Sequence, residues 1–168
     1  MNTFRSGWYL IYTKPRHEKK VHAYLIEKNI TSFLPVEKKL RTWRNRKKYI
    51  EEPLFPSYIF VYLTDMRNYY EGIETSGSLY YVRTGKEIAR VNEAVVKNIK
   101  LATGHGEHLE VSTHSFETGQ RLVINQGALT GLSCELIQFE NEKKFLVRVD
   151  FLQRNILFTL PEEYLIAI

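Results

Sequence analysis

The segment EEPLFPSYIFVYL, residues 51–63, places the tightest limit on the fold of this chain. Its last six residues are all apolar or aromatic, and the prolines before them mark where a strand can begin. Alternate side chains of a strand point to opposite faces of the sheet. Because both faces are apolar here, either both are covered, or one is exposed and available to a partner. The two sets are Tyr58, Phe60 and Tyr62 on one face, and Ile59 and Val61 on the other.

Directly upstream lies the most basic segment, KKLRTWRNRKK, residues 38–48, with seven basic residues and no acidic one. Extended runs on either side of RNRKK predict a long basic hairpin that leads into the strand at 58–63. Its lysines and arginines could follow a phosphate backbone, and Trp43 could stack on a base. The alternative is a solubilising arm without a ligand.

The rest of the N-terminal part predicts an antiparallel α+β sandwich. A strand over Trp8–Thr13 precedes a helix that Pro15 opens and Asn29 ends. A short helix around 68–74 leads to the strand LYYVR, and a last helix starts near Asn92 as N-cap. We therefore expect an antiparallel sheet with flanking helices.

The C-terminal part predicts a small five-stranded SH3-like β-barrel. Its expected strands are RLVIN, SCELIQFE, KKFLVRVDF, NILFTLP and YLIAI. Before them the periodicity disappears and Gly, Ser, Thr and His accumulate, which indicates a flexible linker. We therefore expect an N-terminal domain over 1–103, a linker over 104–116 and a barrel over 117–168.

The net charge of +5 is unevenly distributed. Residues 1–103 carry 19 Lys and Arg against 10 Asp and Glu, whereas residues 104–168 carry 5 against 9. This asymmetry makes the N-terminal part the candidate for binding nucleic acid. A solvated basic face without a ligand has the same composition, so charge alone does not decide between them.

Motifs for catalysis are absent from the sequence, which has no Gly-rich Lys-Ser/Thr phosphate loop, Gly-x-Ser-x-Gly or His-Glu-x-x-His. Its carboxylates are scattered, so we expect no enzyme and no cofactor. His105, His108 and His114 lack an accompanying cysteine or paired carboxylate, and we expect no metal. The single cysteine, Cys134, is expected to be a small apolar residue buried in a strand.

No apolar run approaches the roughly 18 residues that a membrane span needs. The N-terminus MNTFRSGWYLIY also lacks the long apolar core of an export signal. We therefore expect a cytoplasmic protein without a membrane partner.

Several stretches resemble the N-terminal domain of NusG-like transcription elongation factors. They are WYLIYTKPRHEKKV, SFLPVEKKLRTWRNRKK and above all PLFPSYIFVYL. Residues 117–168, with GQRLVINQGALTGLSCELI, resemble the KOW domain that follows in that family. The combination of PLFPSYIFV and RNRKK is most similar to the specialised paralogs of the RfaH and UpxY type.

The resemblance implies an operon-specific antiterminator that binds RNA polymerase and the exposed non-template or upstream DNA, and so suppresses pausing and termination. In this family an apolar patch binds the clamp helices of the largest polymerase subunit, and a basic surface meets the DNA. By position, the apolar patch comprises Tyr12, Phe55, Pro56, Tyr58, Phe60, Tyr81, Val82, Val96 and Ile99. The nucleic-acid-binding residues are Lys14, Arg16, Lys20, Arg44, Arg46, Lys47 and Lys48.

The resemblance leaves other points open. The KOW partner in the family can be a ribosomal protein, a termination factor or RNA. The segment TDMRNYYEGIETSG lacks the His-Thr-rich run with which RfaH touches the second large subunit. In RfaH the C-terminal domain can also pack as helices over the apolar patch, but the strand-like FLVRVDF and NILFTLP favour the barrel here. The alternative function is a general RNA-binding or ribosome-associated KOW module.

Overall fold

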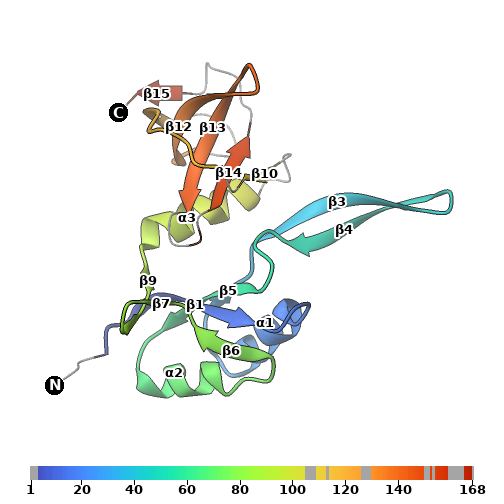
Figure 1. Cartoon of the computed structure of the whole chain (residues 1–168). Coiled ribbons are helices and arrows are strands. Elements are labelled where there is room, and N and C mark those ends of the chain that lie inside the picture. The colour runs from blue at the N-terminus through green and yellow to red at the C-terminus, as the bar shows by residue number, and fades with distance from the viewer. Residues whose placement is uncertain are drawn as a thin grey trace. The chain divides into compact units, whose positions relative to one another are not determined.

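The computed structural model describes residues 4–104, 109–112, 114–125, 130–149, 152, 154–158 and 165–167. The chain divides into two compact units, Met1–Glu93 and Ala94–Ile168, and each is described by itself (Figure 1). Among these residues, the first unit forms a sheet with two helices and two hairpins, and the second forms an antiparallel sheet with one helix. In the described part of the chain, no helix is long and apolar enough to cross a membrane.

An antiparallel sheet forms the centre of the first unit. Its strands follow the order β2-β5-β1-β6, and β9 pairs with the start of β1. The two strands predicted at 8–13 and 58–63 are therefore confirmed, and they lie side by side in the middle of the sheet. The strands are β1 Gly7–Thr13, β2 Ser32–Phe33, β5 Tyr58–Leu63, β6 Ser78–Tyr81 and β9 Arg90–Val91.

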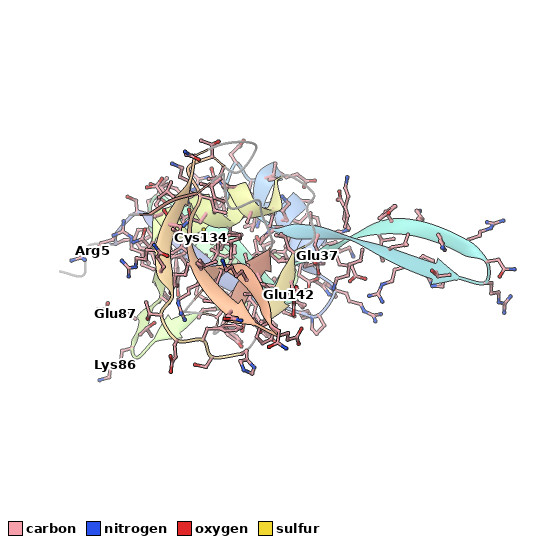
Figure 2. All side chains as sticks on the ribbon, turned by 90° about the horizontal axis from the view of Figure 1, so that it is seen from above. Arg5, Glu37, Lys86, Glu87, Cys134 and Glu142 are labelled. Atoms are coloured by element: carbon pink, nitrogen blue, oxygen red, sulfur yellow. The ribbon has the colours of Figure 1, made fainter. Side chains whose placement is uncertain are left out.

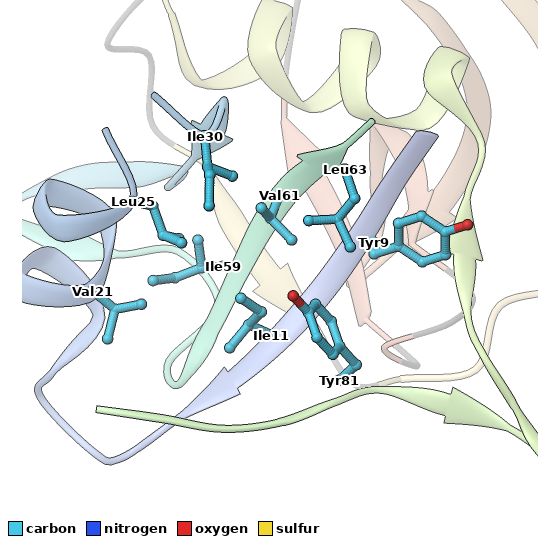
Figure 3. Packing of buried hydrophobic residues seen from close by; sticks show 9 residues of the cluster. All are labelled: Tyr9, Ile11, Val21, Leu25, Ile30, Ile59, Val61, Leu63 and Tyr81. Atoms are coloured by element: carbon cyan, nitrogen blue, oxygen red, sulfur yellow. The ribbon is translucent and has the colours of Figure 1, made fainter. Parts of the chain in front are cut away.

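Two helices cover one face of this sheet, α1 (Glu18–Glu27) and α2 (Met66–Ile73). Leu25 of α1 is buried in the same core cluster as strand residues, and Tyr69 and Ile73 of α2 pack against that cluster. Figure 3 shows side chains of α1 pointing toward those of the central strands. The cluster comprises Tyr9, Ile11, Val21, Leu25, Ile30, Ile59, Val61, Leu63 and Tyr81.

The helix ends differ in part from the predicted ones. Asn29 has a φ of 58°, the left-handed conformation that follows a helix, so its predicted role as a stop is confirmed. Pro15 lies in the turn before α1 rather than in the first turn of the helix. The second helix starts at Met66 because the side chain of Asp65 accepts a hydrogen bond of 2.9 Å from the backbone N–H of Asn68.

A long two-stranded hairpin projects from the sheet, formed by β3 (Val36–Trp43) and β4 (Arg46–Pro53) (Figure 1). The predicted basic hairpin is therefore confirmed. Arg44 and Asn45 form its turn with φ values of 35° and 73°, a pair of positive φ angles that suits the twist of a two-residue hairpin loop. A second, much shorter hairpin consists of β7 (Arg83–Thr84) and β8 (Glu87–Ile88).

In its described residues, the second unit combines the helix α3 (Glu93–Thr103) with a six-stranded sheet. All its strand pairs are antiparallel, in the order β10-β14-β13-β12-β11-β15. The five predicted strands are present, and β10 is an additional one, whereas the closed SH3-like arrangement stays a prediction. The strands are β10 Glu110–Ser112, β11 Gln120–Ile124, β12 Ser133–Phe139, β13 Glu142–Val149, β14 Arg154–Phe158 and β15 Leu165–Ala167.

Part of the segment predicted as a linker forms a short strand, β10. Glu110–Ser112 pair with β14, and the guanidinium of Arg148 donates hydrogen bonds of 3.0 and 2.9 Å to the carbonyls of Phe116 and Glu117. These backbone contacts explain why a polar sequence without periodicity is held against the sheet. His105 and His108 lie outside the described residues, and His114 is exposed beside Phe116.

Cys134 is buried in β12, which confirms its predicted place. Burial, with a smaller contribution from the charge of Glu135, raises the pKa of its thiol to about 11. Because the thiolate is the reactive species, we expect iodoacetamide at pH 8 to label the folded chain slowly and the urea-unfolded chain quickly. Mass spectrometry of timed samples measures both rates, and equal rates would contradict the prediction.

Candidate functional site

The face of the first sheet away from α1 and α2 carries a row of three tyrosines. Tyr58, Tyr12 and Tyr80 are register partners across β5, β1 and β6. The ring centroids of Tyr12 and Tyr58 are 5.2 Å apart in an edge-on arrangement, and those of Tyr12 and Tyr80 are 5.0 Å apart and stacked. Tyr80 is 53% exposed, and the other two are half-buried. We call these three residues the tyrosine row.

A buried layer of aromatic side chains lies next to the tyrosine row on the same face. Phe60 is fully buried, with its ring centroid 5.8 Å from that of Phe33 and 6.4 Å from that of Phe55. Pro56, one residue beyond Phe55, is exposed in the turn that leads into β5. Phe55 and Phe60 therefore support this face from within, whereas Pro56 and the tyrosine row are accessible to a partner.

The structure brings together most of the predicted apolar patch, but not all of it. Tyr81, predicted as part of the patch, lies instead on the opposite face of the sheet. Its hydroxyl donates a hydrogen bond of 2.8 Å to the carbonyl of Tyr69, and its ring belongs to the core beneath the helices. Val82, the next residue, is half-buried, and its N–H donates to the carbonyl of Leu10. Val96 and Ile99 are buried on α3 and belong to the second unit.

Tyr80 was not among the predicted patch residues. Neighbouring residues of a strand point to opposite faces, so Tyr81 and Val82 could not both belong to one patch. If LYYVR is read as a strand, its alternation places Tyr80 and Val82 on one face and Tyr81 on the other. This alternation is the signal by which Tyr80 could have been predicted as a patch residue.

Ion pairs neutralise part of the positive charge of the long hairpin between its base and its turn. Arg41 donates two hydrogen bonds, of 2.8 and 3.2 Å, to one carboxylate oxygen of Glu52. The ammonium of Lys39 lies 2.7 Å from a carboxylate oxygen of Glu37 and 3.7 Å from one of Glu52. The hydrogen bond from Arg41 lowers the pKa of Glu52, and the hydrogen bond with Glu37 raises the pKa of Lys39. Two of the seven basic residues are therefore paired within the hairpin.

The tip of the hairpin keeps its positive charge. Its basic residues are exposed and form no ion pair with a described residue, and the adjacent Trp43 is 55% exposed. Figure 2 shows the side chains standing out on both sides of the ribbon beyond Glu37, which lies near its base. We call Arg44, Arg46, Lys47 and Lys48 the basic tip.

The other predicted nucleic-acid residues lie outside the hairpin, around the start of α1. Lys14 and Arg16 are exposed between β1 and α1, and Lys20 is exposed on α1. The neighbouring Lys19 ties α1 to the hairpin, because its ammonium donates a hydrogen bond of 2.7 Å to the carbonyl of Glu51. The seven predicted basic residues therefore form two groups, four at the tip of the hairpin and three around the start of α1.

Comparison with solved structures defines the class of fold. The structure described as domain interaction in Thermotoga maritima NusG covers 96% of this chain and 96% of its own chain, with a TM-score of 0.56 at 19% sequence identity. The chain thus has a NusG-like fold.

The chain belongs to the NusG family, because the family model described as Transcription termination factor nusG matches residues 6–100, more than half of the chain. Relatives in Chlamydia pneumoniae and Chlamydia trachomatis serovar D are named transcription termination/antitermination protein NusG. Each is 28% identical over 131 residues, which span 71% of this chain and 71% of the relative. The resemblance of the sequence to NusG-like transcription factors is confirmed.

Proposed function

We propose that this chain is a non-catalytic elongation factor that binds RNA polymerase and the DNA exposed beside it, and so suppresses pausing and termination. We further propose that it acts on particular operons, as a specialised member of the RfaH and UpxY type, in the cytoplasm. Membership of a family whose relatives are named termination/antitermination proteins supports the first statement. The combination of PLFPSYIFV with RNRKK, which is similar to those specialised paralogs, supports the second.

The observation that carries the proposal is the presence of two exposed surfaces of different chemistry on one unit. The tyrosine row, with Pro56, is a rigid apolar surface with polar hydroxyl tips, and tyrosine is enriched in the energetic centres of protein interfaces. It suits the clamp helices of the largest polymerase subunit. The basic tip suits the phosphates of non-template or upstream DNA.

The proposed mechanism is stoichiometric binding. A factor attached to polymerase and DNA together favours the elongating state if it binds that state more tightly than the paused one. Coupling of about 1–3 kcal/mol is typical of such effects and changes the ratio of two states by roughly 5- to 150-fold. The second unit would add a further partner, such as a ribosomal protein, a termination factor or RNA.

A second candidate function is direct RNA binding through the basic tip and the second unit, which contains the expected KOW domain. The exposed Trp43 between cations favours it, because an aromatic ring beside basic residues can stack on an unpaired base. This alternative requires no contact with polymerase through the tyrosine row.

Titration against a reconstituted elongation complex distinguishes the two functions. At physiological salt, the elongation-factor proposal predicts far tighter binding to the complex than to the same DNA scaffold or RNA alone. Fluorescence anisotropy of the labelled chain gives all three affinities. Equal affinity for naked RNA and for the complex would contradict the proposal and support the RNA-binding module.

A further inference from the structure

A tight turn leads into the central strand β5 and presents Pro56 at the surface. The N–H of Tyr58 donates a hydrogen bond of 3.1 Å to the carbonyl of Phe55, so the turn spans Phe55 to Tyr58 with Pro56 second and Ser57 third. Ser57 has a φ of 68°. Proline in second place and a positive φ in third place define a type II turn, in which glycine or asparagine is the usual third residue. A serine with this backbone conformation therefore needs stabilising contacts from other residues.

The support comes from a buried carboxylate on another element. Glu18, in the first turn of α1, is only 5% exposed, and its Oε1 accepts a hydrogen bond of 2.8 Å from the N–H of Ser57. The carbonyl of Ser57 accepts a hydrogen bond of 2.8 Å from the N–H of Thr13, at the end of β1. Ser57 is therefore held from both sides by α1 and β1.

The position of Glu18 in its helix also favours a buried carboxylate. A carboxylate in the first turn of a helix interacts favourably with the positive end of the helix dipole. Among the described residues Glu18 forms no ion pair, and the contact that its carboxylate makes is with the turn. The side chain thus links the start of α1 to the shape of the turn.

We infer that Glu18 is a positioning residue for the partner-binding face. By holding Ser57 at positive φ, Glu18 fixes the direction in which Pro56 is presented and in which the chain enters β5 at Tyr58. The inference rests on the proposed function, since the partner of this face is the polymerase proposed above. Its test must therefore separate the shape of the turn from the identity of the partner.

The test uses three variants at the turn. Glu18→Ala removes the acceptor and lowers the fraction of chains with a closed turn, and we expect weaker binding to the elongation complex, by at most about tenfold, the usual size for loss of a side-chain-to-backbone hydrogen bond. Glu18→Gln keeps a carbonyl acceptor and should bind like the unmodified chain. The double variant Glu18→Ala, Ser57→Gly should regain affinity, because glycine adopts a positive φ without support.

A matched control and a second readout keep the result unambiguous. Lys19→Ala removes the neighbouring tie from α1 to the hairpin without touching the turn, and should leave the affinity unchanged. Amide hydrogen exchange at Tyr58 reports closure of the turn directly and needs no partner. We expect it to be about tenfold faster in Glu18→Ala and restored in the double variant.

Each outcome has a defined meaning. If the unmodified chain fails to bind the elongation complex, the proposed function is wrong, and the exchange rates alone test the role of Glu18. Glu18→Ala could instead lower the thermal stability and change neither the affinity nor the exchange rate of the Tyr58 amide in the folded chain. In that case Glu18 stabilises the fold and does not position the turn. Failure of the glycine double variant to restore both quantities would also overturn the inference.

Discussion

Neutralising the basic tip with Arg44→Gln, Arg46→Gln, Lys47→Gln and Lys48→Gln is expected to remove most of the salt-dependent affinity of the chain for duplex DNA. Each lost phosphate contact lowers the slope of log affinity against log salt by about 0.9 for duplex DNA. The slope should therefore become shallower by about 3 to 4 if all four residues contact phosphates. Titrations between 50 and 200 mM salt, about the range over which such contacts are resolved, measure it.

A matched pair of double variants tests whether position or total charge matters. Arg46→Gln with Lys47→Gln removes one arginine and one lysine from the tip, and Arg83→Gln with Lys86→Gln removes the same charges from the short hairpin. All four residues are exposed. We expect a change in slope of about 2 for the first variant and almost none for the second. Equal changes would mean that the tip is a general solubilising arm.

The main elements of the first unit could be predicted because their signals are local. The alternation in YIFVYL defines two faces, and in the structure the two helices cover the one that carries Ile59 and Val61. Asn29 and the turn at Arg44 and Asn45 are likewise readable from a few neighbouring residues. These features depend on the period of the pattern and on turn chemistry, which the sequence contains.

Which basic residues of the hairpin form ion pairs could not be predicted in the same way. Seven basic residues between 38 and 48 look equivalent in the sequence. The register of β3 against β4 places Glu37 directly opposite Glu52, so that Lys39 and Arg41 can both reach acidic side chains. A shift of one residue would move every side chain to the other face and break this arrangement. Register is a property of the folded pair, and the sequence does not state it.

The contact between Glu18 and Ser57 is a feature of the candidate site that could not be predicted from the sequence. The two residues are 39 positions apart, and neither is unusual in its local sequence. Only the packing of α1 beside the turn explains why a carboxylate is buried and why a serine holds a positive φ. The same reasoning separates Phe60 from the tyrosine row, because burial depends on neighbours that are distant in the sequence.

Phe60 and Tyr80 are expected to respond to substitution in opposite ways. Phe60 is fully buried, so Phe60→Ser removes a core ring, and a loss of about 3–5 kcal/mol of unfolding free energy is typical of truncating a buried phenylalanine. Urea denaturation of the full chain measures it. The variant is therefore a poor test of binding, even though Phe60 lies on the predicted patch. Wild-type stability in Phe60→Ser would contradict its buried place.

Tyr80→Ala, by contrast, is expected to leave the fold intact and to weaken binding to the elongation complex by roughly 30-fold, the loss typical of an interface hot spot. Tyr70→Ala is the matched control, because Tyr70 is 55% exposed against 53% for Tyr80 but lies on α2, over the opposite face of the sheet. We expect no change in affinity for the control. If both substitutions weaken binding equally, the face of the sheet on which an exposed tyrosine lies does not determine its contribution to binding. If neither does, the polymerase binds elsewhere, because an interface centred on the tyrosine row cannot lose its most exposed ring without cost.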